Sequence, residues 1–131
     1  MMPLFDKMWF ALDGDTVVGP LTFSEFQLQT IGLESDGAEW WRRVAEDVVE
    51  GWTISTVFLT LDHSFGHGPP LVFETMVFPE GSYSELYCDR YSTKAEALAG
   101  HKAVVEGLKN RTLEGFDFTP KGQLFAVEVE L

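Results

Sequence analysis

One stretch decides the fold of this chain: Thr56-Val-Phe-Leu-Thr-Leu-Asp-His-Ser-Phe-Gly-His-Gly-Pro-Pro-Leu-Val-Phe-Glu-Thr-Met-Val-Phe78. It holds two apolar segments rich in Val, Phe, Leu and Thr, joined by a short polar loop. This composition is typical of strands, and the prolines stand at the strand ends because proline cannot donate a ladder hydrogen bond. We therefore expect two core strands, residues 52–61 and 71–78.

Upstream of these strands, residues 8–12 predict a short strand that turns at Asp13-Gly14-Asp15 into residues 16–18. Residues 22–30 are ambiguous. Phe23, Phe26 and Ile31 fit a short helical face that Ser24 would cap, and residues 32–37 fit a loop.

Residues 39–50 admit two interpretations. Trp41, Val44, Ala45 and Val48 recur at helical spacing, and Gly51 suits a helix end. The pair Glu50-Gly51 suits a hairpin turn equally well, so we favour a strand pair and leave the helix as the alternative.

The second half predicts a strand over residues 86–91 and then a long helix. Thr93-Lys-Ala-Glu96 forms a capping box, in which the Thr93 hydroxyl and the Glu96 carboxylate each accept a hydrogen bond from a backbone amide. Apolar residues then recur on one face to about residue 110, and residues 123–131 alternate as a closing strand. We expect one α+β domain, residues 1–131: a mainly antiparallel sheet with one principal helix (about 93–110) packed on one face.

Composition narrows the class of protein. The 131 residues carry a net charge of −12 and a single cysteine, and the start of the chain lacks the pattern of a secretory signal. No apolar run approaches the roughly 20 residues of a membrane-spanning helix. A lone Cys88 forms no internal disulfide and suits a reducing compartment. These features predict a cytoplasmic protein without a membrane partner.

The charge is unevenly distributed. Residues 1–89 hold fifteen acidic and three basic residues, whereas residues 90–131 hold six of each. In one interpretation the excess of acidic residues keeps the protein soluble. In the other it forms a negative surface that binds a basic protein or mimics nucleic acid. Direct binding to DNA or RNA is disfavoured because phosphates would be repelled. The acidic candidates for contact are Glu46, Asp47 and Glu50.

The loop between the two core strands carries the other candidates. Asp62, His63, His67 and Glu74 have the donor types of a metal site, but the glycines and prolines between them forbid the helix that would align the two histidines. We therefore predict no metal and no cofactor. Instead, Asp62 caps local amides in a tightly turning loop, which together with Phe65 can contact a partner.

Three further side chains have groups that can react or bind. Glu74 shares an apolar strand face, so it is either exposed at an edge, satisfied by a Thr or Tyr hydroxyl, or buried as an acid or base. Cys88 lies beside Asp89, which discourages the thiolate that a nucleophile needs. His101 falls on the apolar stripe of the helix, where a packed core residue is expected.

The Leu-Asp-His, Gly-Pro-Pro and Phe-Glu-Thr-Met-Val-Phe elements between Ser55 and Phe78, with Arg90-Tyr-Ser-Thr-Lys-Ala-Glu-Ala-Leu-Ala-Gly-His101, resemble a family of small uncharacterised actinobacterial and actinobacteriophage proteins. The resemblance covers about half the chain. It implies an accessory protein of a phage or prophage in the bacterial cytoplasm, and it implies no catalytic residue.

Three hypotheses follow. The leading one is a non-enzymatic phage or prophage protein that binds a host or phage protein through its acidic surface and the loop 62–70, as an inhibitor or nucleic-acid mimic. The alternative is a small enzyme or ligand- or metal-binding domain centred on residues 62–74, which requires those side chains to converge. The third is a homodimer paired through residues 123–131.

Overall fold

The computed structural model describes residues 7–33 and 40–118. The expected closing strand at 123–131, and with it the dimer contact, lies outside these residues. In chain order the elements are β1 (Trp9–Asp13), β2 (Thr16–Leu21), α1 (Phe23–Thr30), the 3-10 helix η2 (Trp40–Arg42), β3 (Arg43–Val49), β4 (Trp52–Phe58), β5 (Phe73–Pro79), β6 (Tyr87–Tyr91) and α2 (Lys94–Asn110).

The main sheet has the strand order β3-β4-β5-β6, and every neighbouring pair is antiparallel. Glu50 and Gly51 link β3 to β4 with φ angles of 49° and 88°, the positive pair that a type I′ hairpin turn requires. The turn places Val49 opposite Trp52. The strand interpretation is therefore confirmed for residues 43–49, and the helical alternative is wrong.

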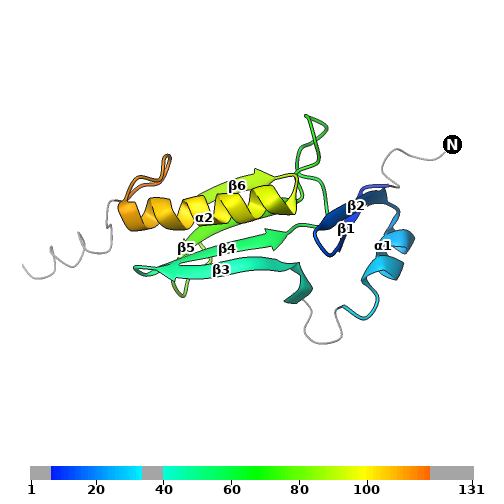
Figure 1. Ribbon diagram of the computed structural model, residues 1–131, viewed down its shortest axis with the longest axis horizontal. Coiled ribbons are helices and arrows are strands. Elements are labelled where there is room, and N and C mark those ends of the chain that lie inside the picture. Colours follow the sequence, from blue (N-terminus) through cyan, green and yellow to red (C-terminus); the bar gives the residue numbers. More distant parts are fainter. Residues whose placement is uncertain (1–6, 34–39, 119–131) are drawn as a thin grey trace, which may run out of the picture.

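Helix α2 lies along one face of this sheet (Figure 1). Its N-terminus has the expected capping box, since Thr93 accepts from the Glu96 amide and Glu96 accepts from the Thr93 amide. Its apolar stripe packs on alternate strand residues and closes two clusters of core side chains. One contains Ile54, Val77, Val104 and Leu108; the other contains Phe10, Phe58, Phe73 and Ala97. The predicted α+β architecture with one principal helix on a mainly antiparallel sheet is confirmed.

The N-terminal segment forms a second, two-stranded sheet, β1-β2, with α1 beside it (Figure 1). The Phe10 amide donates to the Thr60 carbonyl at 2.8 Å, which ties the hairpin to the segment that follows β4. Residues 23–30 are helical, but the expected cap at Ser24 is wrong. Thr22 is the N-cap and forms a capping box with Glu25, because its hydroxyl reaches the third amide of the helix.

The other face of the main sheet carries the residues that alternate with the core. Ile54, Thr56 and Phe58 are buried towards α2, while Thr53, Ser55 and Val57 between them are half-buried on the opposite face. Strand pairing places residues of β3, β5 and β6 on this opposite face, here named the open face: Glu46, Val48, Glu74, Met76, Phe78, Cys88 and Arg90.

Among the described residues, no helix is long and apolar enough to cross a membrane.

Gly100 sets how closely α2 approaches β6, because a Cβ atom at this position would overlap the Tyr91 ring. Helix propensity alone predicts that Gly100→Ala stabilises by about 1 kcal/mol. We expect instead a loss of about 1–3 kcal/mol from overpacking, measured by urea unfolding. In a Tyr91→Ala background the same change should stabilise. A gain in the parent protein would contradict this packing.

Candidate functional site

The loop between β4 and β5 is organised by Asp62. One carboxylate oxygen accepts from the Ser64 amide at 2.7 Å and from the Leu71 amide at 2.9 Å, and the other accepts from the Ser64 hydroxyl at 2.9 Å. The His63 amide donates to the Leu71 carbonyl at 2.9 Å. The two ends of the loop are thereby held together, as expected of an aspartate that caps local amides.

These contacts also determine the charge state of the loop base. Burial by itself would raise the pKa of Asp62, but the hydrogen bonds from Ser64 and Leu71 outweigh it, so the pKa is lowered. The carboxylate therefore stays ionised at neutral pH. Its contribution to stability is present above the pKa of an unfolded aspartate and is lost as the pH falls through the lowered value.

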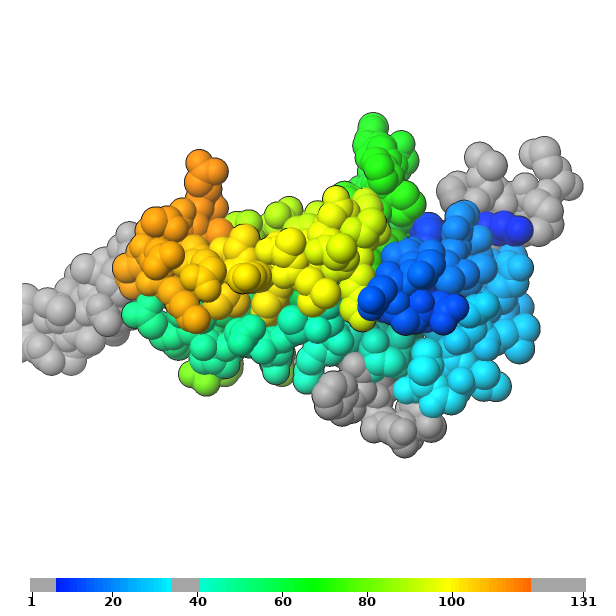
Figure 2. Space-filling view, viewed as in Figure 1, coloured from blue at the N-terminus to red at the C-terminus, as the bar shows by residue number. Residues whose placement is uncertain are grey.

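The middle of the loop projects from the body of the protein. Residues 62–70, green in Figure 2, rise from the surface beside α2 and the N-terminal hairpin. Phe65 is 83% exposed and has a φ of 54°, in the left-handed region that a bulky residue rarely adopts. His63 is half-buried and His67 is exposed. The loop thus presents an aromatic side chain on a constrained backbone.

Glu74 does not belong to this loop site. It is buried, 7% exposed, on the open face of β5, and Oε2 lies 2.9 Å from Nε of Arg90 on β6. The Cys88 thiol lies 3.5 Å from the same oxygen. Two of the alternatives, exposure at an edge and a Thr or Tyr hydroxyl partner, are wrong. Register places Arg90 directly opposite Glu74, and the guanidinium compensates the buried carboxylate.

The same contacts lower the reactivity of Cys88, the only cysteine in the sequence. Burial, followed by the Glu74 charge, raises the pKa of the Cys88 thiol to about 12. Thiolate is the nucleophilic form, so this side chain is unsuited to nucleophilic chemistry at neutral pH. We expected the same outcome from Asp89, but the carboxylate with the largest effect on the thiol is Glu74.

Each acidic candidate on β3 and its turn lies beside a cationic or histidine side chain. Glu46 is 3.9 Å from Arg43, Asp47 is 2.7 Å from His101, and Glu50 is 3.8 Å from Arg111. Two of these three partners come from α2 or the residue after it. Asp47 and Glu50 therefore join β3 and its turn to α2 and the residue after it, whereas Glu46 pairs within its own strand.

His101 is a buried core residue, as expected, but its polar contacts are unusual. Its Nε2 lies 2.7 Å from Asp47 Oδ2, and its Nδ1 lies 2.7 Å from the Thr56 hydroxyl, which also contacts the Thr75 hydroxyl. The order carboxylate, imidazole, hydroxyl is that of an acyl-transfer triad. Thr56 is 0% exposed, however, so its hydroxyl has no access to a substrate. The chain of contacts joins α2 to the centre of the sheet.

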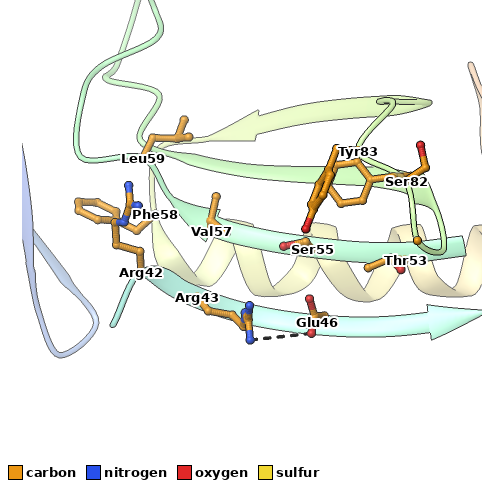
Figure 3. Close-up of a pocket in the computed structure, with 12 residues that line it drawn as sticks. Arg42, Arg43, Glu46, Thr53, Ser55, Val57, Phe58, Leu59, Ser82 and Tyr83 are labelled. Atoms are coloured by element: carbon orange, nitrogen blue, oxygen red, sulfur yellow. Dashed lines mark ion pairs between the residues drawn. The ribbon is translucent and has the colours of Figure 1, made fainter. Parts of the chain in front are cut away.

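The open face contains a cavity of about 580 Å³ that no motif in the sequence indicated. Figure 3 shows Arg42 and Arg43 towards one end, Ser82 and Tyr83 towards the other, and Val57, Ser55 and Thr53 of β4 along the floor. Of the predicted site residues, only Glu46 lines it. In the sequence, the cavity is indicated only by the small polar side chains that alternate along β4. They reveal a cavity only when the strand register is known.

The side chains of the metal or enzyme alternative make separate contacts. Asp62 contacts Ser64 and Leu71, whereas Glu74 contacts Cys88 and Arg90. Within residues 7–33 and 40–118, no three His, Cys, Asp or Glu side chains are grouped so as to hold a metal ion. The structure therefore gives no support to a site centred on residues 62–74.

Comparisons with models of protein families, with curated proteins and with solved structures find no match to this chain.

The raised pKa of Cys88 has a kinetic consequence. A rise from 9.0 to about 12 lowers the thiolate fraction about a thousandfold, and the greater nucleophilicity of a more basic thiolate returns about thirtyfold. We expect iodoacetamide to alkylate the native protein at pH 8 at least about thirtyfold more slowly than the urea-unfolded chain. Intact mass spectrometry measures both rates on the single cysteine. Equal rates would show that the thiol is ordinary.

The Thr56 hydroxyl can be tested by an isosteric change. Thr56→Val leaves Nδ1 of His101 and the Thr75 hydroxyl without this buried partner, so we expect a loss of about 2 kcal/mol in the free energy of unfolding. Thr53→Val, on the open face of the same strand, is the matched control and should change stability by less than about 0.5 kcal/mol. Equal effects of the two changes in urea unfolding would refute a structural role for the contact chain.

Proposed function

We propose that this protein is a non-enzymatic accessory protein of an actinobacteriophage or prophage that binds a host or phage protein in the bacterial cytoplasm. The phage setting rests on the resemblance of residues 55–78 and 90–101 to actinobacteriophage proteins. The binding role rests on one observation above the others: Phe65 stands 83% exposed on a loop whose base is fixed by Asp62.

A constrained aromatic tip is suited to docking. Aromatic side chains supply much of the binding energy in interfaces because a partner pocket can remove their whole surface from water. Asp62 holds the loop closed before any partner arrives, so less conformational entropy is lost on binding. An exposed Phe65 with positive φ costs stability in the free protein, and burial in a partner would offset that cost.

The charge of the chain favours a basic partner. A net charge of −12 attracts basic proteins over a distance of about one Debye length, roughly 10 Å at moderate salt. Glu46, Asp47 and Glu50 each have a nearby cationic or histidine side chain. These partners offset the three charges locally, so the field that attracts a basic partner comes mainly from the remaining net charge of the chain. The partner that fits both features has a basic surface around an apolar pocket, as in an enzyme whose basic site binds nucleic acid.

The experiment is capture of partners from an actinobacterial lysate at low and high salt, identified by mass spectrometry and repeated with a Phe65→Ser variant. We expect the partner to be retained at low salt, weakened at high salt, and bound at least tenfold more weakly by Phe65→Ser, which corresponds to about 1.4 kcal/mol.

The matched control is Tyr83→Ser, which removes an aromatic ring that is 94% exposed elsewhere on the surface. It should leave capture unchanged, and Asp62→Asn should weaken capture by loosening the loop. The proposal fails if Phe65→Ser retains every partner with the affinity of the parent. The nucleic-acid mimic version fails if added DNA does not compete with this protein for the captured partner.

A further inference from the structure

We infer that the open face carries a binding site for a neutral sugar, a pyranose ring with free hydroxyl groups. The site is the cavity of about 580 Å³ along β4, a volume within the range of roughly 300–1,000 Å³ that small-molecule sites occupy. No residue of the loop 62–70 lines it. The inference therefore goes beyond the proposed protein contact and does not depend on it.

The charges around the cavity favour an uncharged ligand. Arg42 and Arg43 line it, and both already have partners within the chain, so we assign the ligand no ion pair with either. Their guanidinium groups oppose the binding of a cation, whereas the net charge of −12 opposes the approach of an anion. A neutral ligand meets neither repulsion.

The floor of the cavity carries hydroxyl groups that are available to a ligand. Ser55 lies directly opposite Glu46 on the neighbouring strand, so their Cβ atoms are about 5 Å apart on the same face. Thr53 lies two residues before Ser55, about 7 Å along β4. Within the part of the chain that the structure describes, the hydroxyls of Thr53 and Ser55 have no hydrogen-bond partner. Each can donate one hydrogen bond and accept two, which suits a ring that carries several hydroxyls.

Glu46 adds a strong acceptor beside these hydroxyls. It is the single acidic residue among the described residues that line the cavity. Its Oε2 lies 3.9 Å from Arg43, and both side chains are nearly half exposed. The two oxygens of a carboxylate offer about four lone-pair positions. Oε1 can therefore accept from a ligand hydroxyl while Oε2 keeps its contact with Arg43.

The far end of the cavity is aromatic. Tyr83 is 94% exposed, and its ring meets Phe78 edge to face with ring centroids 6.3 Å apart. An exposed ring gains when a ligand removes its apolar surface from water. One face of a pyranose consists of C–H groups and its hydroxyls project from the rim. The ring can therefore stack on Tyr83 while rim hydroxyls reach Ser55 and Thr53, which line the same cavity (Figure 3).

The test is a titration of the full ¹⁵N-labelled chain, followed by amide chemical shifts, with the methyl glycosides of glucose, galactose and mannose. We expect saturable shifts at Ser55 and Tyr83 with at least one glycoside at millimolar concentration. Sorbitol has the hydroxyls without the ring, and tetrahydropyran has the ring without the hydroxyls. Each should bind at least about tenfold more weakly. Tighter binding of adenosine than of every glycoside would identify a heteroaromatic ligand and overturn the inference.

Variants locate the site. Tyr83→Ser should weaken binding at least about tenfold, because it removes the stacking ring at an exposed position without disturbing the core. Ser55→Ala should also weaken binding, and if that change disturbs the sheet, Tyr83→Ser decides. The matched control is Leu28→Ser, which removes an apolar side chain that is 73% exposed on α1 and should leave the affinity unchanged. Absence of saturable shifts with all three glycosides overturns the inference, and so does unchanged affinity in Tyr83→Ser.

Discussion

The packing of α2 on the main sheet is the contact on which the rest of the structure depends. Both clusters of core side chains include residues of this helix: Val104 and Leu108 in one, Ala97 in the other. A sheet with one apolar face cannot remain in water alone, so the helix is what makes the β3–β6 sheet stable. Gly100 allows the close approach to Tyr91, and the His101 contacts add a polar connection within the same interface.

This one-sided packing creates two different surfaces. The face of β4 that meets α2 is buried, and the opposite face retains small polar and aliphatic side chains that line a cavity. The loop 62–70 leaves the end of the same strand and carries its aromatic side chain away from the body. The sheet thus has a projecting loop with an exposed aromatic side chain beyond one end of β4, and a cavity on its open face.

Several of the carboxylates also connect elements of the fold. Asp47, Glu50 and Glu74 lie beside His101, Arg111 and Arg90, whose positions in the chain are well separated from theirs. Paired in this way, the carboxylates link β3 to the helix side of the molecule and β5 to β6. Because these carboxylates already have partners, none of them by itself marks a contact site. The exposed Phe65 ring is therefore the stronger basis for the proposed function.

Local patterns were sufficient for much of the fold. The β-branched composition of β4 and β5, the Glu50-Gly51 turn and the Thr93 capping box each operate within a few residues, so each could be identified from its own segment. The capping role of Asp62 belongs to the same class, because its Ser64 contacts lie two residues away. The cap of α1 was missed although Thr22 and Glu25 form the same four-residue pattern as Thr93 and Glu96; the weak periodicity after it concealed the start of the helix.

The sequence by itself determined the strands, the long helix, the acidic charge and the turning loop with Phe65, because these depend on neighbours along the chain. Only the tertiary structure decided that Glu74 faces Arg90, that His101 joins Asp47 to Thr56, and that Arg42 and Arg43 share a cavity with Tyr83. Those contacts join residues from 16 to more than 40 positions apart. They depend on sheet register and on where α2 docks, and a single sequence carries no local signal for either.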